Sequence, residues 1–541
     1  MTAVRIAETS VATTVPALRV RGLTVRYAGR EPAVRDVDLE VGPGEIVALL
    51  GQSGSGKSSI LNAVLGLLPD DAAAETAELA FGGQPVDPAD RRRMRAIRGR
   101  RVGLVPQDCT VALDPVLRVG PQLLEGVPGA RRLTREQRRA RIAELLGRVG
   151  FDDPDAVARR YPHELSGGMA QRVLIAVALA AGPALLIADE PAAALDTIAQ
   201  ARVMDWIAVL AERERIGVLM VTHDLALAAE RATRGVLLGG GTVRTEGDIG
   251  TVIRAARAGL GAPPSPAPAA PSAATRPREV VPGSGGEPAE LLALDGVRKL
   301  YGGAGVHEAS LTLAPGDALA LVGGSGAGKT TLARLLTGLE SPDAGAVRFA
   351  GRDLRTLDRA ARREFRRAVQ LVAQQPFSAI DPRYSAHRAI EEPLRAFAIG
   401  DRKARVRELA ARVGLPEEVL SHTPDRLSGG QCQRVAIARA IATGPRVLIC
   451  DEAVSALDDA ATAQILALLR TLRADLGLAV VFVTHDLNAA AAVTDRLVVL
   501  AAGRVVETGA TAEVFGNPRH PYTRDLVAAT PRPVPDPEEN P

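Results

Sequence analysis

The chain carries the same ordered set of short motifs twice, and this internal repetition limits its fold more than any other feature. A glycine-rich loop begins at Gly51 and again at Gly323, and an LSGG segment with its serine at position Ser166 returns with Ser428. The spacing between loop and LSGG segment is similar in the two copies. Such a duplication predicts two domains of one fold, joined in tandem.

Length and composition are consistent with two globular domains. The chain has 541 residues, of which 46% are hydrophobic and 24% charged, so each copy can bury its own core. Residues 261–290 are rich in proline, alanine, glycine and serine, which cannot build a core and indicate a linker. We predict a flexible N-terminus at 1–15, a first domain at 16–258, a linker at 259–289, a second domain at 290–531 and a flexible C-terminus at 532–541.

Short apolar segments predict the sheet of each domain. Residues 45–50 and 318–322 run directly into the glycine-rich loops, and residues 184–188 and 447–450 form later apolar stretches. A strand, a glycine loop and then a helix is the order of an α/β unit. The predicted fold class is therefore α/β, with a parallel-rich sheet covered by helices on both faces.

Charge and hydropathy exclude two broad classes of protein. The formal net charge is +3, and basic and acidic residues are interspersed, which is not the pattern of a nucleic-acid-binding surface. The most apolar uncharged run, residues 173–188, is shorter than the roughly 18 to 20 residues of a membrane span and is interrupted at Gly182 and Pro183. We interpret this run as a buried helix followed by a strand.

The cysteines and the first residues favour a cytoplasmic protein. Cys109, Cys432 and Cys450 are scattered and lack CxxC spacing, which indicates a reducing compartment and no zinc site. The first twenty residues contain no apolar stretch typical of a secretory signal.

Both glycine-rich loops match the pattern GxxxxGK[ST], the phosphate-binding loop or P-loop. Its glycines let backbone N–H groups surround phosphate oxygens, its lysine reaches the β- and γ-phosphates of ATP, and its hydroxyl binds Mg²⁺. The predicted phosphate-binding residues are Gly51, Gln52, Ser53, Gly54, Ser55, Gly56, Lys57, Ser58 and Ser59 in the first copy, and Gly323, Gly324, Ser325, Gly326, Ala327, Gly328, Lys329, Thr330 and Thr331 in the second.

Each copy also has an Asp-Glu pair after an apolar strand. In phosphoryl transfer the first carboxylate, here Asp189 or Asp451, holds the metal shell, and the second, Glu190 or Glu452, polarises the attacking water. An acidic pair in this position can also begin a helix. The P-loops upstream favour the catalytic interpretation.

The LSGG segments indicate one family among the proteins that carry a P-loop. Residues 165–169 and 427–431 resemble the signature motif of ABC-type ATPases, although a lone LSGG could simply be a helix start with an N-cap serine. The resemblance implies two P-loop NTPase domains, each with a helical signature subdomain and an antiparallel β-subdomain. It assigns Ser166, Gly167, Gly168, Met169, Ser428, Gly429, Gly430 and Gln431 to nucleotide binding.

The resemblance also assigns four single-residue elements in each copy. A glutamine of the Q-loop touches Mg²⁺ and the attacking water, an aspartate of the D-loop communicates between domains, a histidine contacts the γ-phosphate, and a tyrosine stacks on adenine. These elements match Gln107 and Gln374, Asp196 and Asp458, His223 and His485, and Tyr27 and Tyr301. Taken alone, the histidines could be structural and the tyrosines ordinary strand residues.

The assigned roles fall into three groups. The predicted catalytic residues are Glu190, Glu452, His223, His485, Gln107 and Gln374, and the predicted Mg²⁺ ligands are Ser58, Gln107, Asp189, Thr330, Gln374 and Asp451. In this family each ATP lies between the P-loop of one domain and the signature of the other, which implies two composite sites. Met169 and Ala193 depart from the usual glutamine and serine, and this leaves unequal hydrolysis at the two sites open.

Two further segments resemble the importers of dipeptides, oligopeptides and nickel. Residues 108–115 and 375–382 resemble an extension after the Q-loop, and residues 517–531 resemble the NPxHPYT tail of that family. The resemblance implies ATP and Mg²⁺ as ligands, two transmembrane permease subunits and an extracytoplasmic solute-binding protein as partners, and peripheral attachment to the cytoplasmic face of the cell membrane. Because no cysteine follows Cys450, we expect no iron-sulfur centre in the tail.

Several alternatives stay open at this stage. The substrate expected first is a di- or oligopeptide, with nickel or a metal chelate second. A soluble twin-ABC translation factor also carries two such domains, but it resembles proteins with a long charged helical linker rather than a proline-rich one. A DNA-repair ABC protein would need zinc cysteines or a coiled coil, and an exporter motor would not carry the tail.

Overall fold

The computed structural model describes residues 15–52, 54–107, 109–192, 195–260, 290–455 and 457–531. The chain divides into two units, one of Met1–Leu195 with Ala199–Gly261 and one of Asp196–Ile198 with Ala262–Pro541. The predicted flexible termini, apart from Val15, and residues 261–289 of the predicted linker lie outside the described residues, and the first unit's last helix continues to Leu260. The boundaries given above therefore stay predictions.

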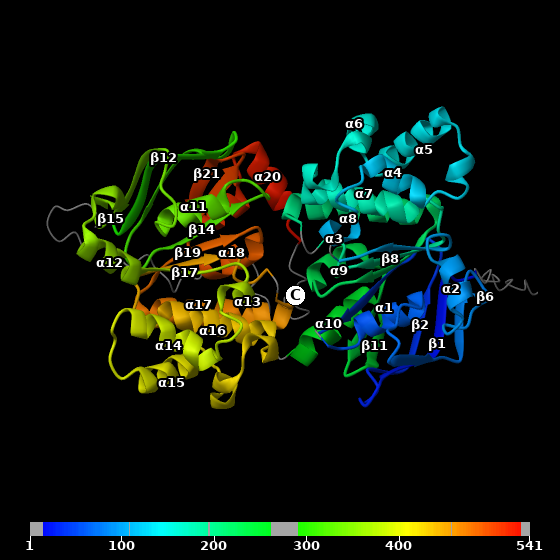
Figure 1. The fold of residues 1–541 in the computed structure, drawn as a ribbon, viewed down its shortest axis with the longest axis horizontal. Helices are drawn as coiled ribbons and strands as arrows, with labels where there is room; N and C mark the ends of the chain where they lie inside the picture. Colours follow the sequence, from blue (N-terminus) through cyan, green and yellow to red (C-terminus); the bar gives the residue numbers. More distant parts are fainter. Residues whose placement is uncertain are drawn as a thin grey trace, which may run out of the picture. The chain divides into compact units, whose positions relative to one another are not determined.

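The first unit contains an antiparallel sheet and a mostly parallel sheet (Figure 1). Its strands are β1 (Leu18–Tyr27), β2 (Val34–Val41), β3 (Ile46–Gly51), β4 (Ala72–Glu75), β5 (Glu78–Phe81), β6 (Gln84–Pro85), β7 (Val102–Val105), β8 (Leu185–Asp189), β9 (Gly217–Val221), β10 (Arg234–Gly239) and β11 (Thr242–Asp248). The antiparallel sheet has the order β2-β1-β5-β6 with β4 also paired to β1, and the other sheet has the order β11-β10-β3-β9-β8-β7. Only β10 and β11 are antiparallel in the second of these sheets.

The first unit also contains helices, some of which cover its parallel sheet while others pack on helices. They are α1 (Lys57–Leu65), α2 (Arg91–Ile97), α3 (Cys109–Ala112), α4 (Val119–Glu125), α5 (Arg135–Arg148), α6 (Pro154–Arg159), α7 (Gly167–Leu179), α8 (Thr197–Glu214), α9 (Leu225–Arg231) and α10 (Ile249–Leu260). The uncharged run at 173–188 is the end of α7 followed by β8, as predicted. No described helix combines the length and apolar character that crossing a membrane requires.

The second unit repeats this plan in one continuous ten-stranded sheet. Its strands are β12 (Leu292–Tyr301), β13 (Ala304–Leu313), β14 (Ala318–Gly323), β15 (Ala344–Phe349), β16 (Arg352–Asp353), β17 (Val369–Val372), β18 (Val447–Asp451), β19 (Ala479–Thr484), β20 (Arg496–Ala501) and β21 (Arg504–Ala510). They follow the order β16-β15-β12-β13-β21-β20-β14-β19-β18-β17. One residue pair, Glu308 with Arg504, joins the antiparallel strands to the parallel ones.

The helices of the second unit largely follow the order of those in the first, with one addition at the end. They are α11 (Lys329–Leu336), α12 (Arg359–Ala368), α13 (Pro376–Ala379), α14 (Ala386–Ala396), α15 (Arg402–Arg412), α16 (Gly429–Ile441), α17 (Asp459–Leu476), α18 (Leu487–Val493), α19 (Thr511–Gly516) and α20 (Pro521–Ala528). Within this unit, α14, α15 and α16 form a helical group on the opposite side of β14 and β19 from β12 and β15 (Figure 1). This is the predicted α/β class with helical and antiparallel subdomains.

The central strands are apolar along their whole length because both of their faces are buried. In β18, Val447 and Ile449 pack into the core shared with the antiparallel strands, while Leu448 and Cys450 pack into the core shared with the helical group. Burying one such aliphatic side chain contributes roughly 1.5–3 kcal/mol. Both cores therefore anchor the strand, and Asp451 stands at its end.

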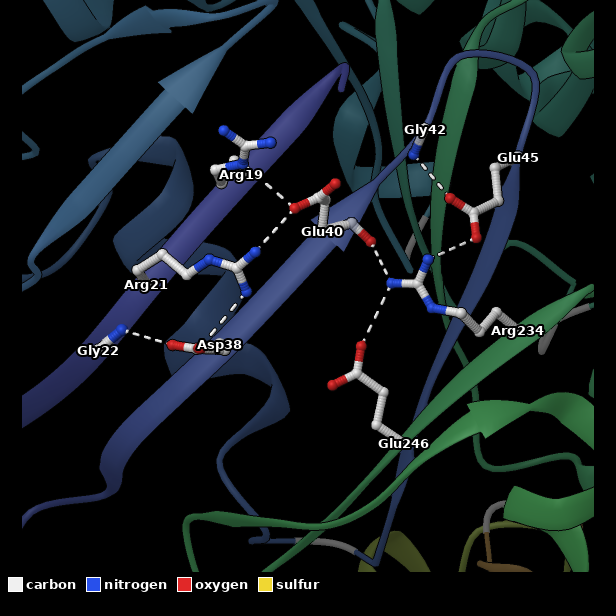
Figure 2. Close-up of polar contacts among 9 residues, drawn as sticks. All are labelled: Arg19, Arg21, Gly22, Asp38, Glu40, Gly42, Glu45, Arg234 and Glu246. Carbon is white, nitrogen blue, oxygen red and sulfur yellow. Dashed lines mark hydrogen bonds and ion pairs between the residues drawn. The ribbon is translucent and has the colours of Figure 1, made fainter. Parts of the chain in front are cut away.

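A charged contact network joins the antiparallel and parallel parts of the first unit (Figure 2). Nη2 of Arg234 on β10 donates to the backbone oxygen of Glu40 on β2 at 2.7 Å, and Nη1 donates to the Glu45 carboxylate at 2.7 Å. Nη2 also lies 3.3 Å from the carboxylate of Glu246 on β11. In the second unit, Arg496 makes the matching contacts to the backbone oxygen of Thr312 and to Asp317, both at 3.2 Å.

Replacing Arg234 with methionine tests the contribution of this network. The Arg234→Met variant keeps most of the aliphatic stem but leaves the Glu40 oxygen and the Glu45 carboxylate without this partner. We expect the free energy of unfolding, measured by urea denaturation, to fall by about 1–3 kcal/mol. The control is Arg26→Met, whose partner Glu75 is 73% exposed, so that its loss changes stability by at most about 0.5 kcal/mol. Equal losses in the two variants would contradict a structural role for Arg234.

Candidate nucleotide-binding sites

Each P-loop connects the end of a central strand to the start of a helix. β3 ends at Gly51 and α1 begins at Lys57, while β14 ends at Gly323 and α11 begins at Lys329. Gly51 and Gly323 both have φ near +153°, and a Cβ atom at Gly323 would lie 2.2 Å from the backbone oxygen of Leu500. Only glycine fits at this position, so the turn out of the strand depends on it. Ser53 lies outside the described residues.

The P-loop lysines are held by the loops themselves. Nζ of Lys57 donates to the backbone oxygens of Gly51 at 2.6 Å and Gln52 at 3.0 Å. Nζ of Lys329 donates to those of Gly323 and Gly324, both at 2.9 Å. Lys329 is only 6% exposed, and this burial lowers its pKa, against the nearby carboxylates, which raise it. Each ammonium group therefore already lies inside its loop, where phosphate oxygens bind in this motif.

The Asp-Glu pairs lie at the ends of β8 and β18 and do not begin helices. Glu190 has φ +46° and Glu452 has φ +47°, a left-handed backbone conformation that is uncommon for a residue with a side chain. Their backbone N–H groups donate to the oxygens of Val221 at 2.8 Å and Val483 at 2.9 Å on the neighbouring strands. The same unusual conformation at the same motif in both units points to a functional constraint.

In the first unit, the predicted glutamine and histidine both converge on Glu190. Nε2 of Gln107 donates to Oε2 of Glu190 at 2.8 Å, and Nδ1 of His223 lies 2.9 Å from Oε1. Burial would raise the pKa of Glu190, but the contact with His223 and the charge of Lys57 lower it below the ordinary value. Glu190 is thus kept as a carboxylate at neutral pH.

The second unit repeats this arrangement around Glu452. Nε2 of Gln374 donates to Oε2 of Glu452 at 2.6 Å, and Nδ1 of His485 lies 3.6 Å from Oε1. The contact with His485 lowers the pKa of Glu452 despite its burial, and the charge of Lys329 lowers it further. Both units therefore hold a charged glutamate between a glutamine and a histidine, in reach of a P-loop lysine.

The pKa of the aspartate beside each glutamate is shifted in the opposite direction. Burial and the neighbouring glutamate raise the pKa of both Asp189 and Asp451. Oδ1 of Asp451 is buried without a hydrogen-bond partner among the described residues, while Thr330 lowers the pKa of this carboxyl through a side-chain hydrogen bond. A buried carboxylate oxygen without a partner, next to a P-loop hydroxyl, fits a Mg²⁺ ligand.

Other residues of the predicted set have local structural contacts. Ser166 and Ser428 cap the helices α7 and α16 by accepting the N–H groups of Met169 and Gln431. The Gln431 side chain returns a bond to the N–H of Ser428 at 3.0 Å, which completes a capping box that Met169 cannot form. The helix-start interpretation of LSGG thus describes the local structure and is compatible with nucleotide binding.

The remaining predicted residues are placed as follows. The Tyr27 hydroxyl lies 3.1 Å from Oγ of Ser59, next to the first P-loop. Tyr301 is 49% exposed, with Lys299 over its ring. Asp458 caps α17 through the N–H of Ala461, and Ala193 lies outside the described residues. The structure thus groups the P-loop lysine, the Asp-Glu pair, the glutamine and the histidine in each unit, while the signature residues form a separate group at a helix start.

One contact of a P-loop was not predicted. The backbone N–H of Gly324 donates to the hydroxyl of Tyr522 on α20 at 2.6 Å. The two residues are 198 positions apart, and no periodicity or spacing in the sequence relates them. The glycine at position 324, where the first copy has Gln52, is the only local signal.

Exchange of the buried aspartate tests the electrostatics of the second site. In Asp451→Asn a charge that burial and Glu452 disfavour is removed, so we expect a higher unfolding temperature at pH 7.5 without nucleotide or metal. Since the folded-state pKa of Asp451 is raised, this gain is present above that pKa and shrinks as the pH falls through it. Differential scanning calorimetry between pH 4 and pH 8 measures it.

The exposed Asp71→Asn change is the control and should leave the unfolding temperature unaltered. A lower unfolding temperature for Asp451→Asn at pH 7.5 would show that the Asp451 carboxylate stabilises the fold, contrary to this interpretation.

Comparison with known proteins gives matches over nearly the whole chain. A family model described as ABC transporter matches residues 34–193 and 306–455, and one described as the oligopeptide/dipeptide transporter C-terminal region matches residues 506–540. The chain is 36% identical to the oligopeptide transport ATP-binding protein OppD of Mycobacterium tuberculosis, over 96% of this chain and 99% of that protein. It is 35% identical to the glutathione import ATP-binding protein GsiA of Escherichia coli, over 92% and 86%.

One solved structure covers both units. A complex of an archaeal ribosomal stalk protein and the archaeal ribosome recycling factor aABCE1 matches 87% of this chain and 86% of its own, with 22% identity and a TM-score of 0.58. At this identity the likeness shows the fold alone.

Proposed function

Because the chain belongs to the ABC transporter family and is an ATP-binding protein and an ATPase of that family, we propose that it energises an importer of di- or oligopeptides. The observation that carries the proposal is the convergence of Gln107 and His223 on Glu190, repeated by Gln374 and His485 on Glu452. Sites with all of these groups have the parts that ATP hydrolysis needs.

The proposed chemistry follows from the charges of these groups. The P-loop lysine binds the β- and γ-phosphates, and the glutamate, kept ionised, polarises the attacking water. Mg²⁺ would be held by Ser58, Gln107 and Asp189 in one site and by Thr330, Gln374 and Asp451 in the other, where it would neutralise phosphate charge. Among the described residues no three His, Cys, Asp or Glu side chains form a metal site, so phosphate and water oxygens would complete the shell.

The composite arrangement of the family is part of the proposal. One site would combine the first P-loop, residues 51–59, with the signature residues Ser428, Gly429, Gly430 and Gln431, and the other would combine residues 323–331 with Ser166, Gly167, Gly168 and Met169. Asp196 and Asp458 would report the state of one site to the other. ATP would close the two domains and hydrolysis would release them.

The glutamines give a route from a permease to the catalytic carboxylate. Gln107 and Gln374 precede the segments that resemble the importer extension, and each donates directly to its glutamate. A permease that moves this segment would therefore move a hydrogen-bond partner of the catalytic group. We propose two permease subunits as partners, a solute-binding protein outside the membrane, and peripheral attachment at the cytoplasmic face.

The peptide substrate is supported by the relatives and by the tail. OppD is named for oligopeptides and GsiA for glutathione, itself a short peptide, and residues 506–540 match the C-terminal region of oligopeptide and dipeptide transporters. The likeness to a ribosome recycling factor concerns the fold alone and does not favour a role in translation.

Removing both catalytic charges tests the assignment of the glutamates. The Glu190→Gln, Glu452→Gln double variant should bind ATP but release phosphate at least about 100-fold more slowly than the wild type, since a general base contributes that factor or more. Phosphate release under Mg·ATP measures the rate. The exposed Glu418→Gln change is the control and should keep the wild-type rate.

Near-normal phosphate release by the double variant would contradict the assignment of Glu190 and Glu452 as catalytic bases. The single variants Glu190→Gln and Glu452→Gln then show whether the two sites hydrolyse equally. Recovery of the chain with two permeases from membranes, rather than with ribosomes, tests the importer assignment.

A further inference from the structure

The second P-loop has a partner from the far end of the chain. Tyr522, the second residue of α20, accepts the backbone N–H of Gly324 at 2.6 Å. Gly324 is the second residue of the predicted loop, next to the backbone oxygens that hold the Lys329 ammonium. This contact therefore fixes the point at which the chain leaves β14 and begins to wrap around phosphate.

The residue at position 324 is matched to the tyrosine. Its φ is not in the left-handed region, so the backbone there does not require glycine. However, a Cβ atom at this position would lie 2.9 Å from the Tyr522 hydroxyl oxygen, closer than such atoms approach. In the first copy the residue that corresponds to Gly324 is Gln52. The last described helix of that unit is α10, which follows β11. The glycine makes room for the tyrosine rather than for a turn.

The tail that carries Tyr522, residues 511–531, is anchored on the elements that build the second site. Leu526 of α20 and Val514 of α19 share a core with Ala320 and Val322 of β14, and with Leu487 of α18. β14 leads into the P-loop, and α18 follows His485 by one residue. The tail thus packs against both the strand that carries the lysine loop and the helix that follows the histidine.

Polar contacts hold the tail on both sides of α20. The Glu507 carboxylate on β21 accepts the backbone N–H groups of Arg519 at 2.9 Å and His520 at 3.0 Å. On the other side, Nδ2 of Asn488 on α18 donates to the backbone oxygen of Pro531 at 3.0 Å. Tyr522 is consequently held in place from β21 and from α18, and its ring is partly buried against the same core.

From these contacts we propose that the tail positions the second P-loop for nucleotide, with Tyr522 acting as a positioning residue through the backbone of Gly324. The inference rests on the proposed nucleotide site at residues 323–331. The proposal implies that the two P-loops are held differently, because the first has Gln52 where the tyrosine contact requires glycine. The loop in the second site is ordered before nucleotide arrives, so less conformational freedom is lost on binding.

The Tyr522→Phe variant removes the hydroxyl and keeps the ring in its core. Tested in the full chain with Lys57→Ala, which silences the first P-loop, it should weaken binding of a fluorescent ATP analogue with Mg²⁺ about five-fold, the worth of one hydrogen bond. With Lys329→Ala in place of Lys57→Ala, the same tyrosine change should leave the dissociation constant unaltered. Tyr384→Phe, which removes a hydroxyl elsewhere in the second unit, is the matched control.

A double-mutant cycle separates positioning from a general loss of structure. If Tyr522 acts through Gly324, then Gly324→Ala displaces the same hydroxyl, and the combined variant should bind no more weakly than the weaker of the two single variants. The thermal unfolding temperature of Tyr522→Phe should stay close to that of its parent. Additive losses of affinity, unchanged affinity in Tyr522→Phe, or tighter binding would each overturn the proposal.

The same series distinguishes failure of the underlying site. Lys57→Ala with Lys329→Ala should bind the analogue far more weakly than Lys57→Ala alone. If it binds equally well, the nucleotide assignment of residues 323–331 is wrong and the tail proposal falls with it. If it fails to bind while Tyr522→Phe has no effect, only the tail proposal is rejected.

Discussion

Parallel pairing of the central strands is the constraint on which each site depends. β14 pairs in parallel with β19 and β20, and β19 with β18, so the carboxyl ends of these strands meet at one edge of the sheet. Where the chain leaves that edge it carries, after three of these strands, a lysine loop, an Asp-Glu pair and a histidine. Parallel sheets place ligands at this edge, and here it gathers groups more than a hundred residues apart.

At the same edge, two carboxylates lie side by side, and the neighbouring histidine and lysine determine which of them carries the charge. Two adjacent carboxylates are buried together, which raises the pKa of the aspartate in each unit. The histidine and the lysine lower the pKa of the glutamate, so the charge is concentrated on the residue that faces them. Glu190 and Glu452 both have a left-handed backbone, and their carboxylates accept hydrogen bonds from Gln107 and Gln374.

Much of this arrangement could be predicted from the sequence, because short motifs encode local geometry. GxxxxGK[ST] after an apolar run predicted the strand, loop and helix around Lys57 and Lys329, and the duplication predicted that the second unit repeats the first. The positive φ of Glu190 and Glu452 could not be predicted, since each N–H bonds to a neighbouring strand that is distant in the sequence. The Tyr522 contact was also beyond the sequence, because tertiary packing alone brings the tail to the loop.

The burial of Cys450 has a consequence for durability. This thiol lies directly before Asp451 in β18, and burial together with that carboxylate raises its pKa to about 12. Since the thiolate is the form that reacts with peroxides and disulfides, the cysteine stays inert at cellular pH. The strand that presents the second catalytic pair can therefore keep its geometry under oxidative stress, although sulfur stands one residue from the reaction centre.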